Sequence, residues 1–362
     1  MKICLYSPYV PKHFGGGEKY FFDVATVLAR DHKVTVAVHR DLKPTEILEK
    51  VARYEDFFHR SLEKVSFVPA PLHDGSILEK LRWTRKFDIC IVVTDGSLFF
   101  SAARKNILHI QIPFTQPKRA FSEQLKLSNW RIKNANSLFT RDIVQRAWNT
   151  KIQFVHYPAI DQACFQAVDK KEKVILSVGR FFKQLHSKRQ DVLVQAFAQL
   201  LHQQPQLTKG WKLVLVGTVE DESYFAEVQQ FAKSLPVEFY TKLNRQELLS
   251  WYKKATFYWH AAGFEVDQDQ HPEQVEHFGI STAEAMASGC IPVVVGKGGQ
   301  VEVLGESLKS LEWQTVEECC YITSELMQQS SDWPAWQAAV RQQAGTFSES
   351  RFAQTLYEMI GK

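Results

Sequence analysis

The sequence predicts an α/β protein made of two doubly wound units. Short apolar runs alternate with amphipathic helical stretches in the first half of the chain, and the alternation starts again near residue 172. Apolar strands of this kind indicate parallel sheets covered by helices on both faces. The 362 residues are enough for two domains, at roughly 100–200 residues for each.

Each half is expected to hold several strands. A helix of about Glu18–Arg30 follows the first strand, and one of about Arg189–Leu201 follows the strand that opens the second half. The expected strands are Ile3–Tyr6, Lys33–His39, Phe87–Val93, Asn106–Ile112, Lys173–Val178, Trp211–Val216, Val237–Tyr240, Ala255–His260 and Ile291–Val295.

The boundary between the halves is expected in the polar stretch Asp161–Glu172, which predicts domains of 1–165 and 166–345. A last helix over Ser348–Ile360 would place Phe352, Leu356 and Ile360 on one face. Ligands of doubly wound sheets bind at the carboxyl ends of the strands, so a cleft between the domains is the expected site.

Composition narrows the classes of function. A net charge of +4 is too weak to indicate nucleic-acid binding, but it suits a protein that handles phosphates or rests on an anionic membrane. The six cysteines lack metal-ligand spacing; Cys4, Cys90 and Cys290 are expected to be small buried side chains in a reducing compartment, whereas the adjacent pair Cys319–Cys320 gives no clear signal. No signal-peptide pattern and no run of about 18 apolar residues occurs, so we expect a cytoplasmic protein.

The most informative segment runs from Glu276 to Gly289. Ser281 is a suitable helix N-cap, and Glu284 three residues later completes a capping box. The predicted helix is short, about Thr282–Ser288, and Gly289 suits its C-terminus. Its N-terminus would offer free N–H groups to a phosphate. From spacing alone, Glu284 is either a helix cap or a ligand-binding carboxylate.

This segment resembles the E-x7-E motif of retaining GT-B glycosyltransferases, specifically glycosyltransferase family 4, the glycosyl transferases group 1. The match includes the intervening F-G and the following E-A-M-A-x-G-x-P. The resemblance implies that Glu276 contacts hydroxyls of the donor sugar and that Glu284 contacts the ribose. It places the donor diphosphate at the N–H groups of the loop and helix start, around Phe278, Gly279, Ile280 and Ser281.

A second segment combines fixed positive charges. Arg180 follows a strand that ends in Val178-Gly179, and Lys188 and Asp191 lie downstream. A diphosphate leaving group needs such cations. The G-R followed by K-x-x-D again resembles family 4, which implies that Arg180 and Lys188 bind the donor phosphates and carry the catalysis. The loop Phe181–Ser187 leaves Lys183 and Arg189 open as alternatives to Lys188.

Two segments of the first half add weaker signals. The run Gly15-Gly16-Gly17-Glu18 is either a tight strand-to-helix turn or, by resemblance, the glycine loop with which Gly16 and Gly17 approach the donor phosphate. The family often carries a histidine two residues before a proline. Here Gln111 occupies that position and His109 precedes it, so both stay candidates for positioning the sugar or acceptor, and a packed histidine is the alternative for His109.

Metal and nicotinamide chemistry are not expected. Asp267-Gln268-Asp269 has the D-x-D spacing of metal-dependent transferases, but its polar surroundings favour a solvated loop. The G-x-G-x-x-G fingerprint of a nicotinamide oxidoreductase is missing. We therefore expect no metal ion and no cofactor.

The resemblance covers nearly the full chain, including Ala135–Phe139 and His156–Pro158. It implies a GT-B fold of two Rossmann-like domains, with residues 346–362 crossing back to the first. The implied activity is retaining transfer of a hexose from a UDP- or GDP-sugar to a saccharide, lipid-linked saccharide or small-molecule acceptor in polysaccharide or glycan biosynthesis. A nucleotide-sugar 2-epimerase and a binding module without catalysis are the alternatives.

A basic and aromatic stretch gives one further expectation. Phe114–Lys133 carries several lysines and arginines beside Phe121 and Trp130. Such a surface fits peripheral contact with the inner face of a membrane that bears a lipid-linked sugar, while a solvated helix face is the alternative.

Overall fold

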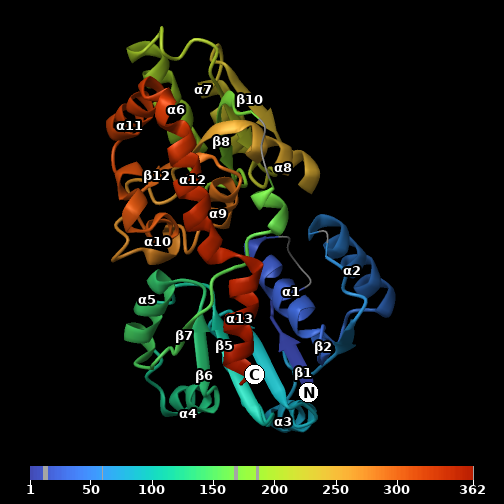
Figure 1. The fold of residues 1–362 in the computed structure, drawn as a ribbon. Helices are drawn as coiled ribbons and strands as arrows, with labels where there is room; N and C mark the ends of the chain where they lie inside the picture. The colour runs from blue at the N-terminus through green and yellow to red at the C-terminus, as the bar shows by residue number, and fades with distance from the viewer. Residues whose placement is uncertain (11–14, 59, 167–169, 185–186, 362) are drawn as a thin grey trace. The chain divides into compact units, whose positions relative to one another are not determined.

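The computed structural model describes residues 1–10, 15–58, 60–166, 170–184 and 187–361 (Figure 1). The chain divides into an N-terminal unit, Met1–Ala159 with Ser350–Lys362, and a C-terminal unit, Ile160–Glu349. The unit boundaries thus fall at 159/160 and 349/350, where the sequence indicates 165/166 and 345/346. Asp169 of the polar boundary stretch and the last residue, Lys362, lie outside the described residues.

The N-terminal unit is built on a seven-stranded parallel sheet in the order β3-β2-β1-β4-β5-β6-β7. The order reverses between β1 and β4, as in a Rossmann fold. The strands are β1 Lys2–Tyr6, β2 Lys33–Val38, β3 Val65–Pro69, β4 Ile89–Thr94, β5 Lys105–Ile110, β6 Ile132–Ala135 and β7 Phe154–Val155.

Helices cover both faces of this sheet. Alternate residues of β1 enter different hydrophobic clusters, because successive side chains of a strand point to opposite faces. Ile3 and Leu5 pack in one cluster, and Cys4 and Tyr6 pack in the other. The helices are α1 Gly16–Leu28, α2 Pro44–Phe58, α3 Ile77–Thr84, α4 Phe121–Asn129, α5 Leu138–Trp148 and α13 Glu349–Ile360.

The last helix belongs to the N-terminal core. In α13, the buried face of Phe352, Leu356 and Ile360 joins the same cluster as Ile3 and Leu5. The Tyr357 hydroxyl donates to the Val27 carbonyl of α1 at 3.4 Å, and α13 lies beside α1 in Figure 1. The face predicted from the spacing of the apolar residues is therefore the buried one.

The C-terminal unit repeats the plan with six parallel strands in the order β10-β9-β8-β11-β12-β13. The prediction of two doubly wound units is confirmed. The strands are β8 Glu172–Val178, β9 Lys212–Val216, β10 Val237–Tyr240, β11 Ala255–His260, β12 Ile291–Val295 and β13 Glu312–Trp313. The helices are α6 Gln190–Gln203, α7 Glu222–Phe231, α8 Arg245–Lys254, α9 Ile280–Ala287, α10 Gln300–Leu304, α11 Val316–Gln328 and α12 Trp333–Ala344.

Two predictions about the whole chain can be compared with the structure. All six cysteines are buried and unpaired, which confirms the expectation for Cys4, Cys90 and Cys290. Among the residues that the structure describes, no helix is both long and apolar enough to cross a membrane.

Candidate functional site

The candidate site lies where the strand order of the C-terminal sheet reverses. In doubly wound sheets, ligands bind at the carboxyl ends of the two strands that flank this reversal. Here these strands are β8, followed by Gly179 and Arg180, and β11, which ends at His260. The neighbouring strand end packs closely, since a Cβ atom on Gly217 would lie 1.9 Å from the Gly179 carbonyl oxygen.

Glu276 forms the centre of this site. The Lys188 ammonium donates a short hydrogen bond to Glu276 Oε2, and His260 Nε2 lies 3.2 Å from the same oxygen. The side chains of Lys188 and Glu276 are only 18% and 17% exposed. Burial alone would raise the pKa of Glu276, but the charge of Lys188 and the contact with His260 hold that pKa well below its usual range. Glu276 is therefore ionised at neutral pH and accepts hydrogen bonds.

His260 and Gln300 support Glu276 from the protein interior. Both residues are fully buried. His260 Nδ1 accepts the backbone N–H of Ala262 at 3.3 Å and lies 2.6 Å from Gln300 Nε2. A ring nitrogen that accepts a backbone N–H carries no proton, so the neutral ring has its hydrogen on Nε2, facing Glu276. Burial also lowers the pKa of His260, which keeps the ring neutral.

Helix α9 begins beside this cluster, earlier than the sequence predicts. Its N-cap is Gly279, with φ of 110°, and Ser281 lies within the first turn, where its hydroxyl accepts from Tyr258 at 2.8 Å. The prediction that Ser281 caps the helix is wrong, because the left-handed glycine turns the chain into the helix two residues earlier. The first N–H groups of α9 have no partner within the helix and can hold an anion. Gly289, with φ of 76°, follows the end of α9 as predicted.

Glu284 does not close a capping box. Its carboxylate is held by two hydrogen bonds from Arg245, the first residue of α8. Phe278 is also buried and packs edge-to-face on Phe347, with 5.1 Å between ring centroids. The side chain of Phe278 is therefore not available to a donor, and only its backbone could contact one.

The cations of the loop after β8 have separate partners. Arg180 donates to both oxygens of Glu220, at 3.0 and 2.9 Å. Lys183 pairs with Glu227, and Arg189 pairs with Asp191. Of the three alternatives, Lys188 is the cation that contacts Glu276. Residues 185 and 186 of the predicted loop Phe181–Ser187 lie outside the described part of the chain.

In the N-terminal unit, the glycine run starts helix α1 at the carboxyl end of β1. The Glu18 carboxylate accepts the Gly15 N–H at 3.0 Å, so this glutamate caps the helix. Gly16 and Gly17 form its first turn, and Gln111 lies against it, since a Cβ atom on Gly17 would be 2.6 Å from Gln111 Oε1. Gln111 thus faces the glycine run.

His109 lies in the core. It is fully buried, its ring stacks on Tyr20 with 3.7 Å between centroids, and Nδ1 makes a short hydrogen bond to Asn134. Burial lowers the pKa of His109 to about 3, so the ring stays neutral. This burial argues against contact with a ligand and leaves Gln111 as the candidate on the sugar or acceptor side.

The remaining predicted feature is the D-x-D segment, which forms a turn. Asp267 Oδ1 accepts the backbone N–H groups of Asp269 and Gln270 at 3.0 and 3.3 Å. Across the described residues, no group of three or more histidine, cysteine, aspartate or glutamate side chains is arranged to hold a metal ion.

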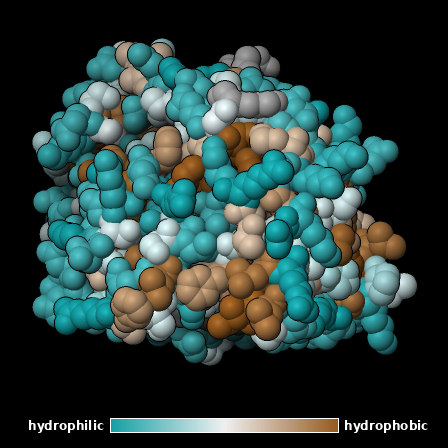
Figure 2. Space-filling model, turned by 90° about the horizontal axis from the view of Figure 1, so that it is seen from below, coloured by the Kyte–Doolittle hydropathy of each residue, from teal (hydrophilic) through white to brown (hydrophobic). Residues whose placement is uncertain are grey.

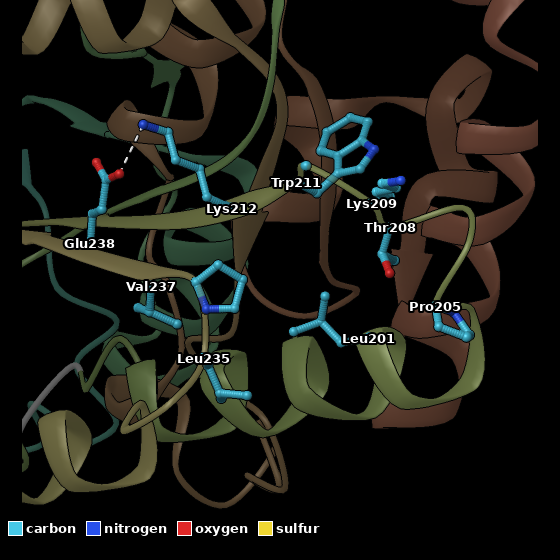
Figure 3. A pocket seen from close by; sticks show the side chains of 11 residues that line it. Leu201, Pro205, Thr208, Lys209, Trp211, Lys212, Leu235, Val237 and Glu238 are labelled. Carbon is cyan, nitrogen blue, oxygen red and sulfur yellow. Dashed lines mark hydrogen bonds and ion pairs between the residues drawn. The ribbon is translucent and has the colours of Figure 1, made fainter.

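A hollow of about 580 Å³ lies at the amino ends of β9 and β10 (Figure 3). It is lined by apolar side chains such as Leu201 and Leu235, and an ion pair of Lys212 and Glu238 at 2.9 Å borders it. Because the strands are parallel, this hollow lies at their amino ends, whereas Arg180 follows the carboxyl end of β8. It is therefore separate from the candidate site.

Residues 162–309 match the family described as Glycosyl transferases group 1. This segment is a glycosyl transferases group 1 domain. The group 1 domain contains every predicted donor-binding residue of the C-terminal unit, from Arg180 to Glu284. The family predicted from the E-x7-E segment is thus confirmed.

Solved structures resemble the chain over its whole length. A glycosyltransferase from Rickettsia africae is 13% identical, covers 100% of this chain and 99% of its own, and has a TM-score of 0.73. HepE from Anabaena, solved in complex with UDP, is 17% identical, covers 99% of both chains and has a TM-score of 0.72. At these identities the likeness establishes the fold, and the predicted GT-B class is confirmed.

Curated relatives match part of the chain. The "GDP-Man:Man(3)GlcNAc(2)-PP-Dol alpha-1,2-mannosyltransferase" of Dictyostelium discoideum is 26% identical over 62% of this chain and 46% of its own length. The protein of the same name from Neurospora crassa is 29% identical over 38% of this chain and 24% of its own. The match thus spans less than half the length of these relatives.

Proposed function

We propose that the protein transfers a hexose from a nucleoside diphosphate-sugar to a saccharide acceptor. The observation that carries this proposal is the cluster of Lys188, Glu276 and His260 beside the start of α9. An ionised carboxylate suits the hydroxyls of a sugar, and a lysine next to a helix N-terminus suits a diphosphate. The two parts of a nucleotide-sugar would then be bound side by side.

The proposed reaction retains the configuration at the anomeric carbon. The bond from that carbon to the diphosphate oxygen breaks, and a bond to the acceptor oxygen forms on the same face of the sugar. The acceptor proton passes to a donor phosphate oxygen. Lys188 and Arg180 would stabilise the negative charge that develops on the diphosphate. Because these cations supply that stabilisation, we propose that no metal ion or cofactor is required.

The donor is proposed to be a UDP- or GDP-sugar. The names of the curated relatives specify GDP-Man, whereas HepE was solved with UDP and with UDP-glucose. These donors are therefore the first to test.

The test of this function is a transfer assay in EDTA with lipid-linked and free saccharide acceptors. Product is expected only with an acceptor present, and the double variant Arg180→Ala/Lys188→Ala is expected to abolish it. Sugar transfer by that variant at the wild-type rate would refute the role of the two cations. Release of free sugar without an acceptor would contradict the proposed transfer.

The acceptor is proposed to be lipid-linked and reached from a membrane surface. On α4, Phe121 is 79% exposed, and Leu125 one turn later is also exposed. On α3, Ile77 and Leu78 are exposed as well. Both helices pack on one segment, since Ala102 N–H donates to Thr84 of α3 and Ser101 N–H donates to Asn129 of α4.

Figure 2 shows the side of the molecule on which α3 and α4 lie, with hydrophobic residues gathered among hydrophilic ones. The charged residues on and beside the two helices are mainly basic. An apolar surface with a basic border fits an anionic bilayer, where each basic side chain near the surface contributes about 1 kcal/mol. The basic residues are Lys80, Arg82, Arg85, Lys86, Lys118, Arg119, Lys126 and Arg131.

Vesicle flotation tests this surface. The wild type is expected to float with vesicles that contain phosphatidylglycerol, and the variant Phe121→Ser/Leu125→Ser is expected to stay in solution. Phe231→Ser on α7 is a control, because Phe231 is also exposed, at 54%, but belongs to the C-terminal unit. Flotation of the double variant at the wild-type level, or no flotation of the wild type, would refute the membrane contact.

A further inference from the structure

A cation of the loop after β8 contacts the segment that carries Glu276. This segment, residues 263–275, begins shortly after β11 and leads directly into Glu276. Arg189 Nη1 donates to the Phe264 carbonyl of the segment at 3.4 Å, and the guanidinium lies over the Phe264 ring, 5.7 Å from its centroid. We infer that Arg189 is a positioning residue, which anchors the segment and so keeps Glu276 in place for the donor sugar. This inference rests on the proposed function.

The backbone of Arg189 is strained. As the N-cap of α6 it has φ of 50° and ψ of 48°, a left-handed conformation that residues other than glycine rarely adopt. Such strain persists only where surrounding contacts hold the residue, and it gathers at functional sites. Glu265, on the segment, also has a positive φ, of 61°, and its Oε2 lies 4.0 Å from Arg189 Nη1. Two left-handed residues therefore face each other where the loop meets the segment.

Asp191 fixes the direction of the Arg189 guanidinium. Arg189 Nε lies 3.2 Å from both oxygens of Asp191, and Nη2 lies 3.2 Å from Oδ2. Asp191 is in turn held by Tyr224 of α7, whose hydroxyl donates to Oδ1 at 2.8 Å. The guanidinium is planar and carries its donors in a fixed geometry, so this pairing directs the remaining nitrogen, Nη1, to the Phe264 carbonyl.

A hollow of about 430 Å³ borders this contact. Side chains beside a hollow lack packing partners on that side, so the segment depends there on its polar contacts. On the segment, Lys297 Nζ donates to the Val266 carbonyl at 2.7 Å, so a second cation holds the carbonyl two residues after that of Phe264. The residues that line the hollow include Ser187, Arg189, Asp191, Tyr224, Phe264 and Gln274.

Lys188 keeps its place without the Arg189 side chain. The Lys188 stem packs over the end of β8, since a Cβ atom on Gly179 would lie 2.4 Å from Lys188 Cγ. The start of α6 is also supported by Gln190, which is buried and donates to the Gly179 carbonyl at 3.0 Å. Loss of the Arg189 side chain is therefore expected to loosen the segment and Glu276 without moving the lysine.

Two variants remove the Arg189 side chain and keep its backbone conformation. Arg189→Gly and Arg189→Asn introduce residues that tolerate the left-handed conformation, so α6 is expected to start as before. Hydrogen exchange followed by mass spectrometry is expected to be ~5-fold faster or more in residues 263–275 and unchanged in α6, because local opening becomes easier once an anchor is lost. Glu265→Gly is the matched control, because it also replaces a left-handed residue, but the Glu265 side chain is 71% exposed. It is expected to leave exchange in the rest of the segment at the wild-type rate.

Calorimetric titration of the full chain connects this anchor to the donor. GDP-Man is compared with GDP, and UDP-glucose with UDP, because Glu276 is proposed to contact only the sugar. In both Arg189 variants, the affinity for the nucleotide-sugar is expected to fall ~3–10-fold more than the affinity for the nucleoside diphosphate, because only a fraction of the molecules then holds Glu276 in the binding conformation. Glu265→Gly is expected to keep the wild-type ratio of the two affinities.

The outcomes separate the inference from the proposed function. Wild-type exchange of residues 263–275 in both Arg189 variants would overturn the inference and leave the proposed function standing. A loss of affinity by the same factor for nucleotide-sugar and nucleoside diphosphate would also overturn it, because a purely structural role predicts that result. If the folded wild type binds none of the four ligands, the proposed function fails, and the exchange measurement alone decides whether Arg189 anchors the segment.

Discussion

The contact between Lys188 and Glu276 leads to a prediction whose magnitude can be worked out from the structure. In Lys188→Met, the Glu276 carboxylate keeps its partly buried position but loses its main counter-charge. Removing one partner of a buried pair costs about 3 kcal/mol at the lower end of the usual range. In a domain of this size each kcal/mol shifts Tm by about 2–4 °C, so the C-terminal unit is expected to melt about 6–12 °C lower.

The same loop supplies a control for this substitution. Lys183 pairs with Glu227 at 2.8 Å, but its side chain is 59% exposed. Solvent screens such a pair, so Lys183→Met is expected to leave Tm nearly unchanged. The double variant Lys188→Met/Glu276→Gln is expected to recover much of the lost stability, because it also removes the unpaired charge.

Thermal melting followed by circular dichroism at pH 7 checks these expectations. The low pKa of Glu276 adds a pH dependence, because its contribution is present above the unfolded pKa of about 4.5 and is lost as pH falls below that value. In Lys188→Met this dependence weakens. An equal Tm loss in Lys183→Met and Lys188→Met, or no recovery in the double variant, would show that the partly buried charge of Glu276 is not what lowers Tm.

Three further predictions concern single residues. Gly279→Ala is expected to destabilise the fold by about 1–3 kcal/mol in a melt, since φ is 110° and the added Cβ atom would lie 2.9 Å from Gln300 Oε1; an unchanged Tm would contradict this. Burial lowers the pKa of His156 to about 4. The free energy of unfolding is therefore expected to fall by up to about 3 kcal/mol as pH falls from about 6.5 to 4, because the unfolded chain takes up the proton first. In His156→Asn, an acid titration should show a smaller decrease. Glu220→Gln is expected to tighten UDP or GDP binding by up to ~5-fold in calorimetry, because it frees Arg180 from a competing anion; weaker binding would argue against that competition.

Two of the strands that the sequence predicts best, β11 and β12, are buried at every residue, whereas the third, β10, is only half-buried. Val237–Tyr240, Ala255–His260 and Ile291–Val295 have the predicted bounds. Strand β6 could not be predicted, because it contains Lys133 and Asn134. The Asn134 amide is satisfied by the Leu108 carbonyl at 3.2 Å, a partner that only the folded sheet supplies. Strands β7 and β13 have two residues each, which is too short for any periodicity to appear.

The site was predictable in its motifs but not in its contacts. Glu276 and Lys188 stand out by resemblance, although they are 88 positions apart and nothing in the spacing shows that they meet. His260 reads as the last residue of a strand, and Arg245 as an ordinary residue at a helix start. The capping-box pattern at Ser281 predicted the wrong helix start, because the helix begins at Gly279, whose left-handed conformation (φ of 110°) is not part of that pattern. The roles in donor binding stay predictions.

We propose that the C-terminal unit binds a nucleoside diphosphate-sugar through Lys188 and Glu276. Titration of the full chain with GDP-Man and UDP-glucose in EDTA tests it most directly. The wild type is expected to bind at least one of these donors, and Lys188→Ala and Glu276→Ala are each expected to weaken binding by ~10-fold or more, the loss expected for a charged hydrogen bond. No binding to the folded wild type, or binding by both variants with the wild-type affinity, would contradict this proposal.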